Sequence, residues 1–461
     1  MNRRADRVAR SPRFGNYEDA EAGASSAPPH GRSNDMVGTA HRRRTFLTIP
    51  TLVLALAGIA WAAGGGLEPN FGTGGVVTSS LTGSTWALTV ASNGKTLVGG
   101  YEAGNGWWLQ RLNADGSGDA GFGAGGIARL FGGGADQNYL LDLAVDANDR
   151  PIAAGFSSVS TISKSGAVTV TKYPTLARFT ATGSLDTTFA GTGWFRVAVP
   201  GSTGSSEGLR VAVLSDGRIL LSGYAPFVVD KKGTKYVRPF VARYSSNGSL
   251  DTTFGSGGYA IDSRFAENVA DSFAWGLAVQ STGKIVLAWR TTAHRWMITR
   301  FLSNGTVDSA FPTISSTTDY VVGLAIDASD RILVTGSKPT ASGADAKLVR
   351  YGADGALDTS FGAGGTATVH VSDAQYAWTR PIVQPLDGAL VFGVQVGSTS
   401  PTATTVRVLG DGSLDPSYGS NGVGATLPGF PRCAGLAPDG GILLGGLVSA
   451  YQQFVARYAP N

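Results

Sequence analysis

The chain repeats one pattern of apolar and polar positions, in which two short apolar runs are separated by a polar turn. The runs are rich in β-branched residues, and the turns contain Asn-Gly, Asp-Gly or a related pair. Runs and turns of this kind are typical of β-hairpins. Seven hairpins are predicted, at residues 88–100, 143–155, 211–223, 277–289, 324–336, 382–393 and 436–446.

Each predicted hairpin is followed by a variable loop, a third apolar run and a fourth short run. The third run is seen at 239–244 and 347–351, and the fourth at 74–78 and 257–261. Each unit is therefore expected to form four short antiparallel strands.

A segment of constant length joins the third and fourth runs. Counted from Arg243, it has Gly248 five residues on, Asp251 eight residues on and Phe254 eleven residues on. The same spacing starts at Arg111, Arg178, Arg300, Arg350 and Arg407. The aromatic anchors recur on average every ~58 residues, a repeat length that favours a propeller over a solenoid. The expected fold is all-β: a seven-bladed β-propeller with four-stranded antiparallel blades.

The ring is expected to close by pairing of the N- and C-terminal strands. The seventh Arg strand ends four residues after Arg457, and its missing Gly, acidic residue and aromatic are found at Gly65, Glu68 and Phe71. Such a seam leaves no open sheet edge. Because a buried Arg needs a carboxylate, the seven Arg–acid pairs, including Arg457 with Glu68, are interpreted as structural ion pairs.

These motifs resemble the delta-60 repeat family of bacterial β-propeller proteins. The resemblance rests on the pattern (apolar)AV-x-x-DGKILVAG followed by ARY-x-x-DGSLDTTFG-x-GG, and it covers essentially all of 64–461. It implies a propeller in an exported bacterial protein. It implies no reaction.

The N-terminal segment has the features of an export leader. Residues 1–45 are basic and lack apolar periodicity, so they are expected to be disordered, and a start at Met36 would make 1–35 a gene-start artefact. The apolar run 45–62 follows HRRR and predicts a signal peptide cleaved after Ala62. An uncleaved membrane anchor is the alternative. Either a Sec or a twin-arginine route fits, with a periplasmic or extracellular destination.

The distribution of charge bears on the kind of partner, and the cysteine content bears on how the fold is stabilised. Nine of the 37 basic residues and five of the 33 acidic residues lie in 1–62, which leaves 28 of each in the propeller region, 63–461. A neutral ring gives no reason to expect nucleic acid as a partner. The single cysteine, Cys433, cannot form an internal disulfide and is expected to be a small buried residue.

Candidate binding residues lie on the variable loops and at the expected channel mouth. The longest loops are predicted at 156–174 and 224–238, the latter with Lys231, Lys232 and Lys235. An acidic residue recurs just before the innermost strand in five of the seven units, either to bind a cation or polar ligand at the mouth or to cap the strand entrance. These residues are Asp136, Glu207, Asp271, Asp319 and Asp373.

Aromatic residues provide a second set of candidates. Trp107 and the cluster of His294 with Trp296 would suit a sugar-binding face, although packing between blades is the favoured interpretation. Trp108 shares the third-strand aromatic position with Phe240 and is expected in the core.

No catalytic motif, cofactor or metal site is predicted. The chain contains no HExxH motif and no phosphate-binding loop, and the Asp-Gly turns lack the ligand spacing of an EF-hand calcium loop. The favoured hypothesis is an exported, monomeric binding or scaffold module that recognises a glycan, peptide or envelope protein. The alternative is a glycan-active hydrolase or lyase that uses the acids at the channel mouth.

Overall fold

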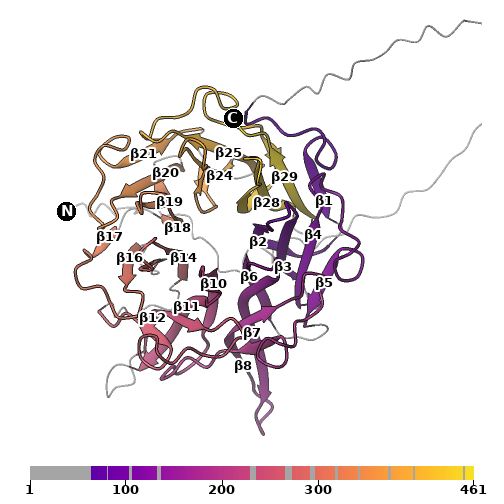
Figure 1. Ribbon diagram of the computed structural model, residues 1–461, viewed down its shortest axis with the longest axis vertical. Coiled ribbons are helices and arrows are strands. Elements are labelled where there is room, and N and C mark those ends of the chain that lie inside the picture. Colours follow the sequence, from indigo (N-terminus) through magenta and orange to yellow (C-terminus); the bar gives the residue numbers. More distant parts are fainter. Residues whose placement is uncertain are drawn as a thin grey trace, which may run out of the picture. The chain divides into compact units, whose positions relative to one another are not determined.

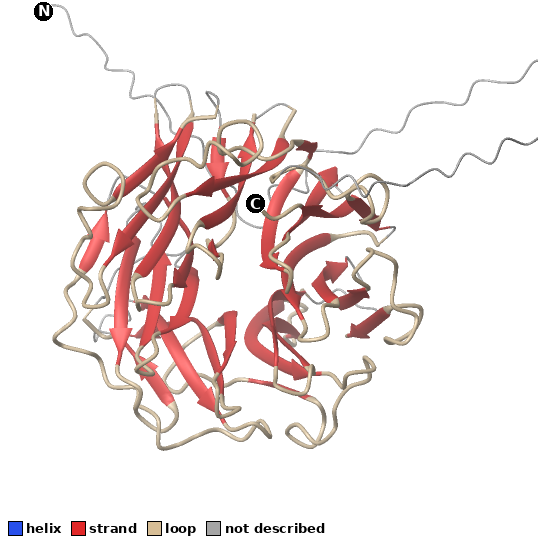
Figure 2. Cartoon of the chain, turned by 45° about the horizontal axis from the view of Figure 1, so that its top comes forward, coloured by secondary structure: helices blue, strands red, loops and turns tan. Residues whose placement is uncertain are grey.

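The computed structural model divides the chain into two units, Met1–Ala60 and Trp61–Asn461, and all described residues belong to the second. The structure describes residues 64–79, 81–102, 106–131, 137–228, 235–264, 273–290, 296–316, 320–340, 343–371, 375–397, 400–449 and 452–461. Strands and loops make up this part of the chain, without helices (Figure 2). Consequently, none of its elements is a helix that could span a bilayer. The expected leader and signal segment lie outside the described residues.

Seven antiparallel sheets follow one another round a ring in the order of the sequence (Figure 1). Blade 1 contains β2 (Ser84–Val90), β3 (Thr96–Glu102), β4 (Gly106–Leu112) and β5 (Ile127–Leu130). Blade 2 contains β6 (Asn138–Val145), β7 (Pro151–Ile162), β8 (Val168–Arg178) and β9 (Trp194–Arg196). Blade 3 contains β10 (Glu207–Val213), β11 (Ile219–Val228), β12 (Lys235–Tyr244) and β13 (Tyr259–Ile261). Blade 4 contains β14 (Phe273–Val279), β15 (Ile285–Arg290), β16 (Trp296–Phe301) and β17 (Ile314–Ser316).

The remaining blades complete the ring. Blade 5 contains β18 (Tyr320–Ile326), β19 (Ile332–Pro339), β20 (Ala344–Tyr351) and β21 (Thr366–Val369). Blade 6 contains β22 (Gln375–Ala377), β23 (Ile382–Val383), β24 (Leu390–Val396), β25 (Thr402–Val408) and β26 (Leu427–Pro428). Blade 7 contains β27 (Phe430–Leu436), β28 (Ile442–Ser449), β29 (Gln452–Tyr458) and β1 (Val76–Ser79). The predicted seven-bladed β-propeller is therefore confirmed.

The first strand of each blade lies innermost. These strands contact one another in a closed circle that runs β2, β6, β10, β14, β18, β23, β27 and back to β2. In blade 6 the innermost strand is split, because β22 and β23 both pair with β24. A circle of seven short strands surrounds a central channel, and the residues that line the channel come from many blades.

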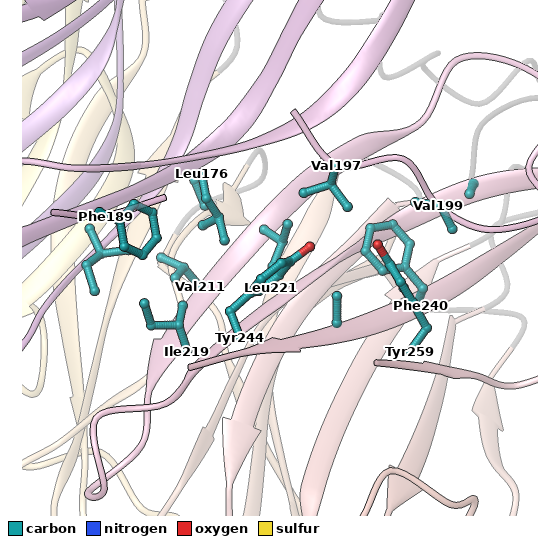
Figure 3. Packing of buried hydrophobic residues seen from close by; sticks show 14 of the residues in the cluster. Leu176, Phe189, Val197, Val199, Val211, Ile219, Leu221, Phe240, Tyr244 and Tyr259 are labelled. Carbon is teal, nitrogen blue, oxygen red and sulfur yellow. The ribbon is translucent and has the colours of Figure 1, made fainter. Parts of the chain in front are cut away.

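Side chains packed between adjacent sheets hold the blades together. Between blades 2 and 3, Leu176 of β8 and Phe189 pack against Val211 of β10 and Leu221 of β11 (Figure 3). All four side chains are buried, as is Phe240 further along the same interface. Burial of a large apolar side chain contributes about 1.5–3 kcal/mol, so each pair of blades has its own apolar core.

The seam closes as the repeat predicts. Strand β1 pairs antiparallel with β29, from Val76 opposite Ala456 to Ser79 opposite Gln453. Glu68 lies 2.8 Å from the guanidinium of Arg457. The turn that other blades make within one segment is thus assembled here from the two ends of the second unit.

The seven Arg side chains form the ion pairs expected from their spacing. In six blades the nitrogen–oxygen distance to the carboxylate is 2.6–2.9 Å, and Arg407 also pairs with Asp415. Five guanidinium groups also lie 4.3–4.8 Å from the centroid of the aromatic ring eleven residues on. Buried ion pairs with this second contact are structural devices, as the sequence interpretation held.

The same Arg side chains also reach into the next blade, which the sequence does not indicate. Arg243 of blade 3 donates to the carbonyl oxygen of Ser303 in blade 4 at 2.6 Å. Five other blades have the equivalent bond: Arg111 to Ala181, Arg178 to Ser246, Arg300 to Ala353, Arg350 to Gly410 and Arg457 to Ala114. A backbone acceptor is present in any residue type, so no sequence pattern marks it.

The turn glycine at each of these joints has a positive φ and approaches the preceding blade closely. Gly305 has φ +87°, and a Cβ there would lie 2.6 Å from the backbone nitrogen of Gly255 in the preceding blade. That nitrogen donates to the carbonyl of Asn304 at 2.7 Å. The turn is therefore the contact between blades as well as a hairpin connection, which explains why its length never varies.

The ion pairs predict loss of stability in acid. Hydrogen bonding from Lys95, followed by the contact with Arg111, lowers the pKa of Asp119 to about 2. The Thr253 hydroxyl and then Arg243 lower the pKa of Asp251. Because the folded-state pKa lies below the unfolded value of about 3.9, the stabilisation is present above pH ~4 and is lost as pH falls towards about 2.

We therefore expect the urea midpoint of unfolding to fall steeply over this pH range. The Asp119→Asn variant should be less stable at neutral pH and should show a shallower fall. A midpoint that does not change between neutral pH and pH ~2.5 would contradict the assignment of these carboxylates.

Candidate functional site

Most of the acids predicted at the channel mouth lie outside the described residues. These are Asp136, Asp271, Asp319 and Asp373, and His294 lies outside them as well. Glu207 is described: it begins β10, is buried, and lies 3.1 Å from the ammonium of Lys172 in β8. Its carboxylate therefore joins blades 2 and 3 through an ion pair.

The two tryptophans considered for a sugar-binding face are buried. Trp107 is 0% exposed and Trp296 is 3% exposed, and each belongs to an apolar cluster between blades. The ring of Trp107 meets that of Phe131 edge-on at 5.6 Å. Packing, the favoured interpretation, is confirmed. Trp108 and Phe240 are buried as predicted.

The Asp-Gly turns act as turns in the structure. The carboxylate of Asp411 accepts hydrogen bonds from the backbone N–H and the hydroxyl of Ser413, at 2.8 and 2.7 Å. Nowhere in the described residues do three acidic, His or Cys side chains gather as a metal site.

An irregularity of the innermost strands shapes the channel. Six of these strands have a β-bulge at a similar level, after two or three ladder pairs, and the seventh is interrupted between β22 and β23. Bulges redirect side chains. Residues at this level include Trp86, Asp142, Arg210, Trp378 and Arg432, and all of them border one cavity in the channel.

This cavity, which we call the channel cavity, has a volume of about 40 Å³. Three arginines, Arg210, Arg380 and Arg432, line it with a single carboxylate, Asp142. Its apolar wall includes Trp86 and Trp378. A space of this size holds a few water molecules or one small charged group.

Two indole rings hold the side chain of Arg432. Its guanidinium carbon lies 4.6 Å from the ring centroid of Trp86 and 4.8 Å from that of Trp378. Cation–π contacts of this type stabilise a guanidinium without neutralising its charge.

Backbone carbonyls rather than carboxylates hold Arg210. It donates to the carbonyl oxygens of Trp275, Leu141 and Leu209 at 3.0, 3.3 and 2.8 Å. The nearby carboxylate of Asp142 accepts the backbone N–H of Val211 at 3.0 Å. Within the described part of the chain, neither side chain takes part in an ion pair.

Arg380 occupies the interruption of the innermost strand of blade 6. The ladder stops at Ala377 and resumes at Ile382. Buried Thr379 fixes the backbone between them: its hydroxyl accepts the N–H of Gly393, and its carbonyl accepts the hydroxyl of Thr335, both at 2.8 Å. Gly323 of β18 leaves space for the backbone of Arg380, because a Cβ at Gly323 would overlap it. Arg380 itself is exposed and borders the solvent side of the channel cavity.

Cys433 also borders the channel cavity and is buried, as predicted. Burial raises the pKa of its thiol to about 12. The thiol is therefore neutral at physiological pH and adds no charge to the cavity.

Sequence reasoning missed the residues of the channel cavity. A signal was available: Trp86 and Trp275 each precede the conserved Leu of the first hairpin strand by two residues, at Leu88 and Leu277. The residue type at this position of the repeat varies among Trp, Leu, Val and Arg, whereas the position two residues later is apolar in every repeat. A position that accepts both Arg and apolar residues is not confined to the core.

The segment predicted as the loop 156–174 is largely strand, which corrects the prediction. Strand β7 continues to Ile162 and β8 begins at Val168, with a five-residue turn between them. The extended part, 159–162 paired with 168–171, projects from blade 2, and we call it the β7–β8 ribbon (Figure 1). Alternating Thr, Val and Ile explain the error, because these residues favour strands in the absence of turn residues.

The β7–β8 ribbon presents an apolar face to solvent. Ile162 is paired with Val168, and Val170 lies two residues further along the same face. Their exposed fractions are 74%, 62% and 44%. No other strand in the described regions pairs with 159–162 or 168–171.

The second predicted loop, 224–238, is also shortened by strands. Strand β11 runs to Val228 and β12 begins at Lys235. Lys231 and Lys232 lie outside the described residues, as does the side chain of Lys235.

Three segments of the chain match a family model described as "Domain of unknown function (DUF5122) beta-propeller". They are residues 91–122, 214–254 and 328–361, and each ends on an aromatic anchor of the repeat. The match supports a β-propeller family. The finer resemblance to the delta-60 repeat stays a prediction. No curated protein matches the chain.

Solved structures with similar folds include a glucose dehydrogenase, which is 13% identical, with a TM-score of 0.35 over 66% of this chain and 95% of that chain. The soluble aldose sugar dehydrogenase of Escherichia coli is 12% identical, with a TM-score of 0.36 and coverage of 83% and 99%. Drosophila semaphorin 2a is 9% identical, with a TM-score of 0.40 and coverage of 80% and 72%. Likenesses at this level carry no argument about activity, ligand or partner.

Proposed function

We propose that the protein is an exported β-propeller that binds a protein partner through the β7–β8 ribbon. One observation carries the proposal: Ile162, Val168 and Val170 are exposed together on one face of the β7–β8 ribbon. Exposed apolar patches are typical of interaction sites.

The chemistry of the ribbon favours a protein over a glycan. Its eight residues are Ser, Thr, Val and Ile, with no aromatic ring to stack on a sugar and no charged side chain to orient one. An apolar surface of a partner protein could instead cover this face. The seven-bladed ring would then be a rigid frame for this ribbon.

Export is the second part of the proposal. It is supported by the basic segment 41–44 and the apolar run 45–62 of the sequence. The alternative of a glycan-active enzyme depends on Asp136, Asp271, Asp319 and Asp373, and no described contact favours it.

The partner-binding proposal is tested with two matched double variants of the full chain. Ile162→Ser/Val168→Ser removes the apolar face, and Leu357→Ser/Leu386→Ser removes two exposed leucines elsewhere, 46% and 87% exposed. Both should keep the melting temperature of the parent, because exposed substitutions change stability by about 0.5 kcal/mol or less.

Capture from an envelope extract should recover a protein with the parent and the leucine variant, but not with the ribbon variant. The purified partner should then bind the parent saturably, with an affinity about tenfold or more above that for the ribbon variant. Equal capture by all three chains would overturn the proposal. So would capture of nothing, or a ribbon-dependent dimer of this chain with no other partner.

A further inference from the structure

Asp142 is a buried carboxylate in the wall of the channel cavity. The residue is 8% exposed, and its Oδ2 accepts the backbone N–H of Val211 at 3.0 Å. Among the described residues, no donor lies within hydrogen-bonding distance of its other oxygen, Oδ1. A buried carboxylate is costly unless hydrogen-bond donors or a positive charge satisfy both of its oxygens. A ligand that brings a positively charged donor to Oδ1 would therefore be stabilised by Asp142.

The bulge of β6 sets the position of this carboxylate. The ladder between β6 and β7 shifts register between Leu140 and Asp142, directly before the residue that borders the cavity. Bulges redirect side chains and are frequent beside binding sites. Asp142 therefore reaches the cavity through an irregularity of its own strand.

Arg380 provides the complementary group at the solvent side of the channel cavity. It is exposed, and it borders the same cavity as Asp142. Burial raises the pKa of the Cys433 thiol, Arg380 then lowers it and Asp142 raises it, so both charges lie close to this sulfur atom. A guanidinium fork binds a carboxylate through two parallel hydrogen bonds. One small cavity thus combines an acceptor for a cationic group with a donor for an anionic group.

We propose that the channel cavity binds a small α-amino acid as its zwitterion, with the α-ammonium group on Asp142 and the α-carboxylate on Arg380. The two charges of such a ligand are separated by a single carbon atom, and each meets a protein group of opposite sign. A volume of about 40 Å³ admits the few heavy atoms of glycine or alanine and excludes a sugar ring. The indoles of Trp86 and Trp378 in the cavity wall suit the Cα or methyl group. This site goes beyond the β7–β8 ribbon and does not depend on it.

The inference is tested by titration of the full chain, followed by calorimetry and by intrinsic fluorescence, to which Trp86 and Trp378 contribute. Glycine and alanine are the probes. Acetate carries only the carboxylate of the ligand, and methylammonium carries only the ammonium group. At least one amino acid should bind saturably, and about tenfold or more tightly than either half-ligand. Binding of neither amino acid, or equal binding of glycine and acetate, would overturn the proposal.

Two variants assign the two ends of the ligand. Arg380→Gln should weaken the binding of glycine and of acetate about tenfold or more, because both lose a charged hydrogen bond. Asp142→Asn should weaken glycine binding by a similar factor without weakening acetate binding, since only the ammonium group loses its partner. The new amide oxygen can still accept the N–H of Val211. An equal loss of glycine and acetate binding in Asp142→Asn would contradict the contact with the ammonium group.

Matched charge changes outside the cavity serve as controls. Arg129→Gln lies on the outermost strand of blade 1 with a 45% exposed side chain, and Asp216→Asn lies in the β10–β11 turn with a 49% exposed side chain. Both should leave the glycine affinity unchanged, and weakening equal to that of the cavity variants would reject the site. Because Arg380 is exposed, Arg380→Gln tests the site even if Asp142→Asn fails to fold, and an unchanged glycine affinity in Arg380→Gln would overturn the proposal. Ile162→Ser/Val168→Ser should bind glycine like the parent, so failure of the partner proposal leaves this test unaffected.

Discussion

Replacement of Arg350 by Met is expected to lower the free energy of unfolding by about 3 kcal/mol or more. The side chain of Arg350 is 4% exposed, its Nε lies 2.7 Å from Asp358, and it also donates to Gly410 in the next blade. Its guanidinium lies 4.4 Å from the ring centroid of Phe361. The substitution leaves a carboxylate and a carbonyl of two different blades without their shared donor.

The matched control is Arg129→Met. Arg129 is 45% exposed and lies 3.6 Å from Glu102, beyond hydrogen-bonding distance, so its loss should cost about 1 kcal/mol or less. Urea unfolding followed by fluorescence should therefore shift far more for Arg350→Met than for Arg129→Met. Addition of Asp358→Asn to Arg350→Met should recover part of the loss, because it removes the uncompensated charge. Equal shifts for the two single variants would show that the buried pair is not a structural device.

The second large effect is expected at Gly305. An alanine there adopts φ near +87° at a cost of about 1–2 kcal/mol, and its Cβ meets the backbone of Gly255 at 2.6 Å. That contact displaces the N–H of Gly255 from the carbonyl of Asn304 and adds about 1–3 kcal/mol. The total loss of unfolding free energy is expected to be about 2–5 kcal/mol.

Gly257→Ala separates the two contributions. Gly257 has φ +59°, and nothing lies within 4 Å of an added Cβ. Its substitution should therefore cost only the conformational term of about 1–2 kcal/mol. If Gly305→Ala and Gly257→Ala shift the urea midpoint equally, the joint between blades contributes nothing beyond local geometry.

The contact between neighbouring blades, made by the central Arg and the turn glycine, explains how a ring with one cysteine and no described metal site is held together. We call this contact the joint. Each blade contributes an Arg, a carboxylate, an aromatic and a Gly within twelve residues, and the next blade contributes only backbone carbonyls. Loss of one joint should weaken two neighbouring blades. Arg350, for example, pairs with Asp358 in its own blade and donates a hydrogen bond to the carbonyl oxygen of Gly410 in the next blade. Stability is thus distributed round the circle instead of residing in a single core.

The sequence by itself determined the number of blades, the hairpins, the ion pairs and the seam. These features depend on contacts between residues about twelve positions apart or fewer, or on a turn whose spacing is the same in every repeat. They can therefore be recognised in one sequence. The pairing of Arg457 with Glu68 was predictable even across the two ends of the propeller, because six complete copies define what the seventh lacks.

Tertiary structure alone decided what lines the channel and what projects from the ring. Arg210, Arg380 and Arg432 come from three blades, and each is unremarkable within its own repeat. Their proximity follows from bulges at one level of the innermost strands, and a bulge is a matter of register between strands, which composition does not specify. The β7–β8 ribbon likewise continues as strand because two Thr- and Val-rich segments meet in register. Contacts between residues close in the sequence can be predicted from the repeated motif. Contacts between residues of different blades depend on how the blades are arranged in the folded ring.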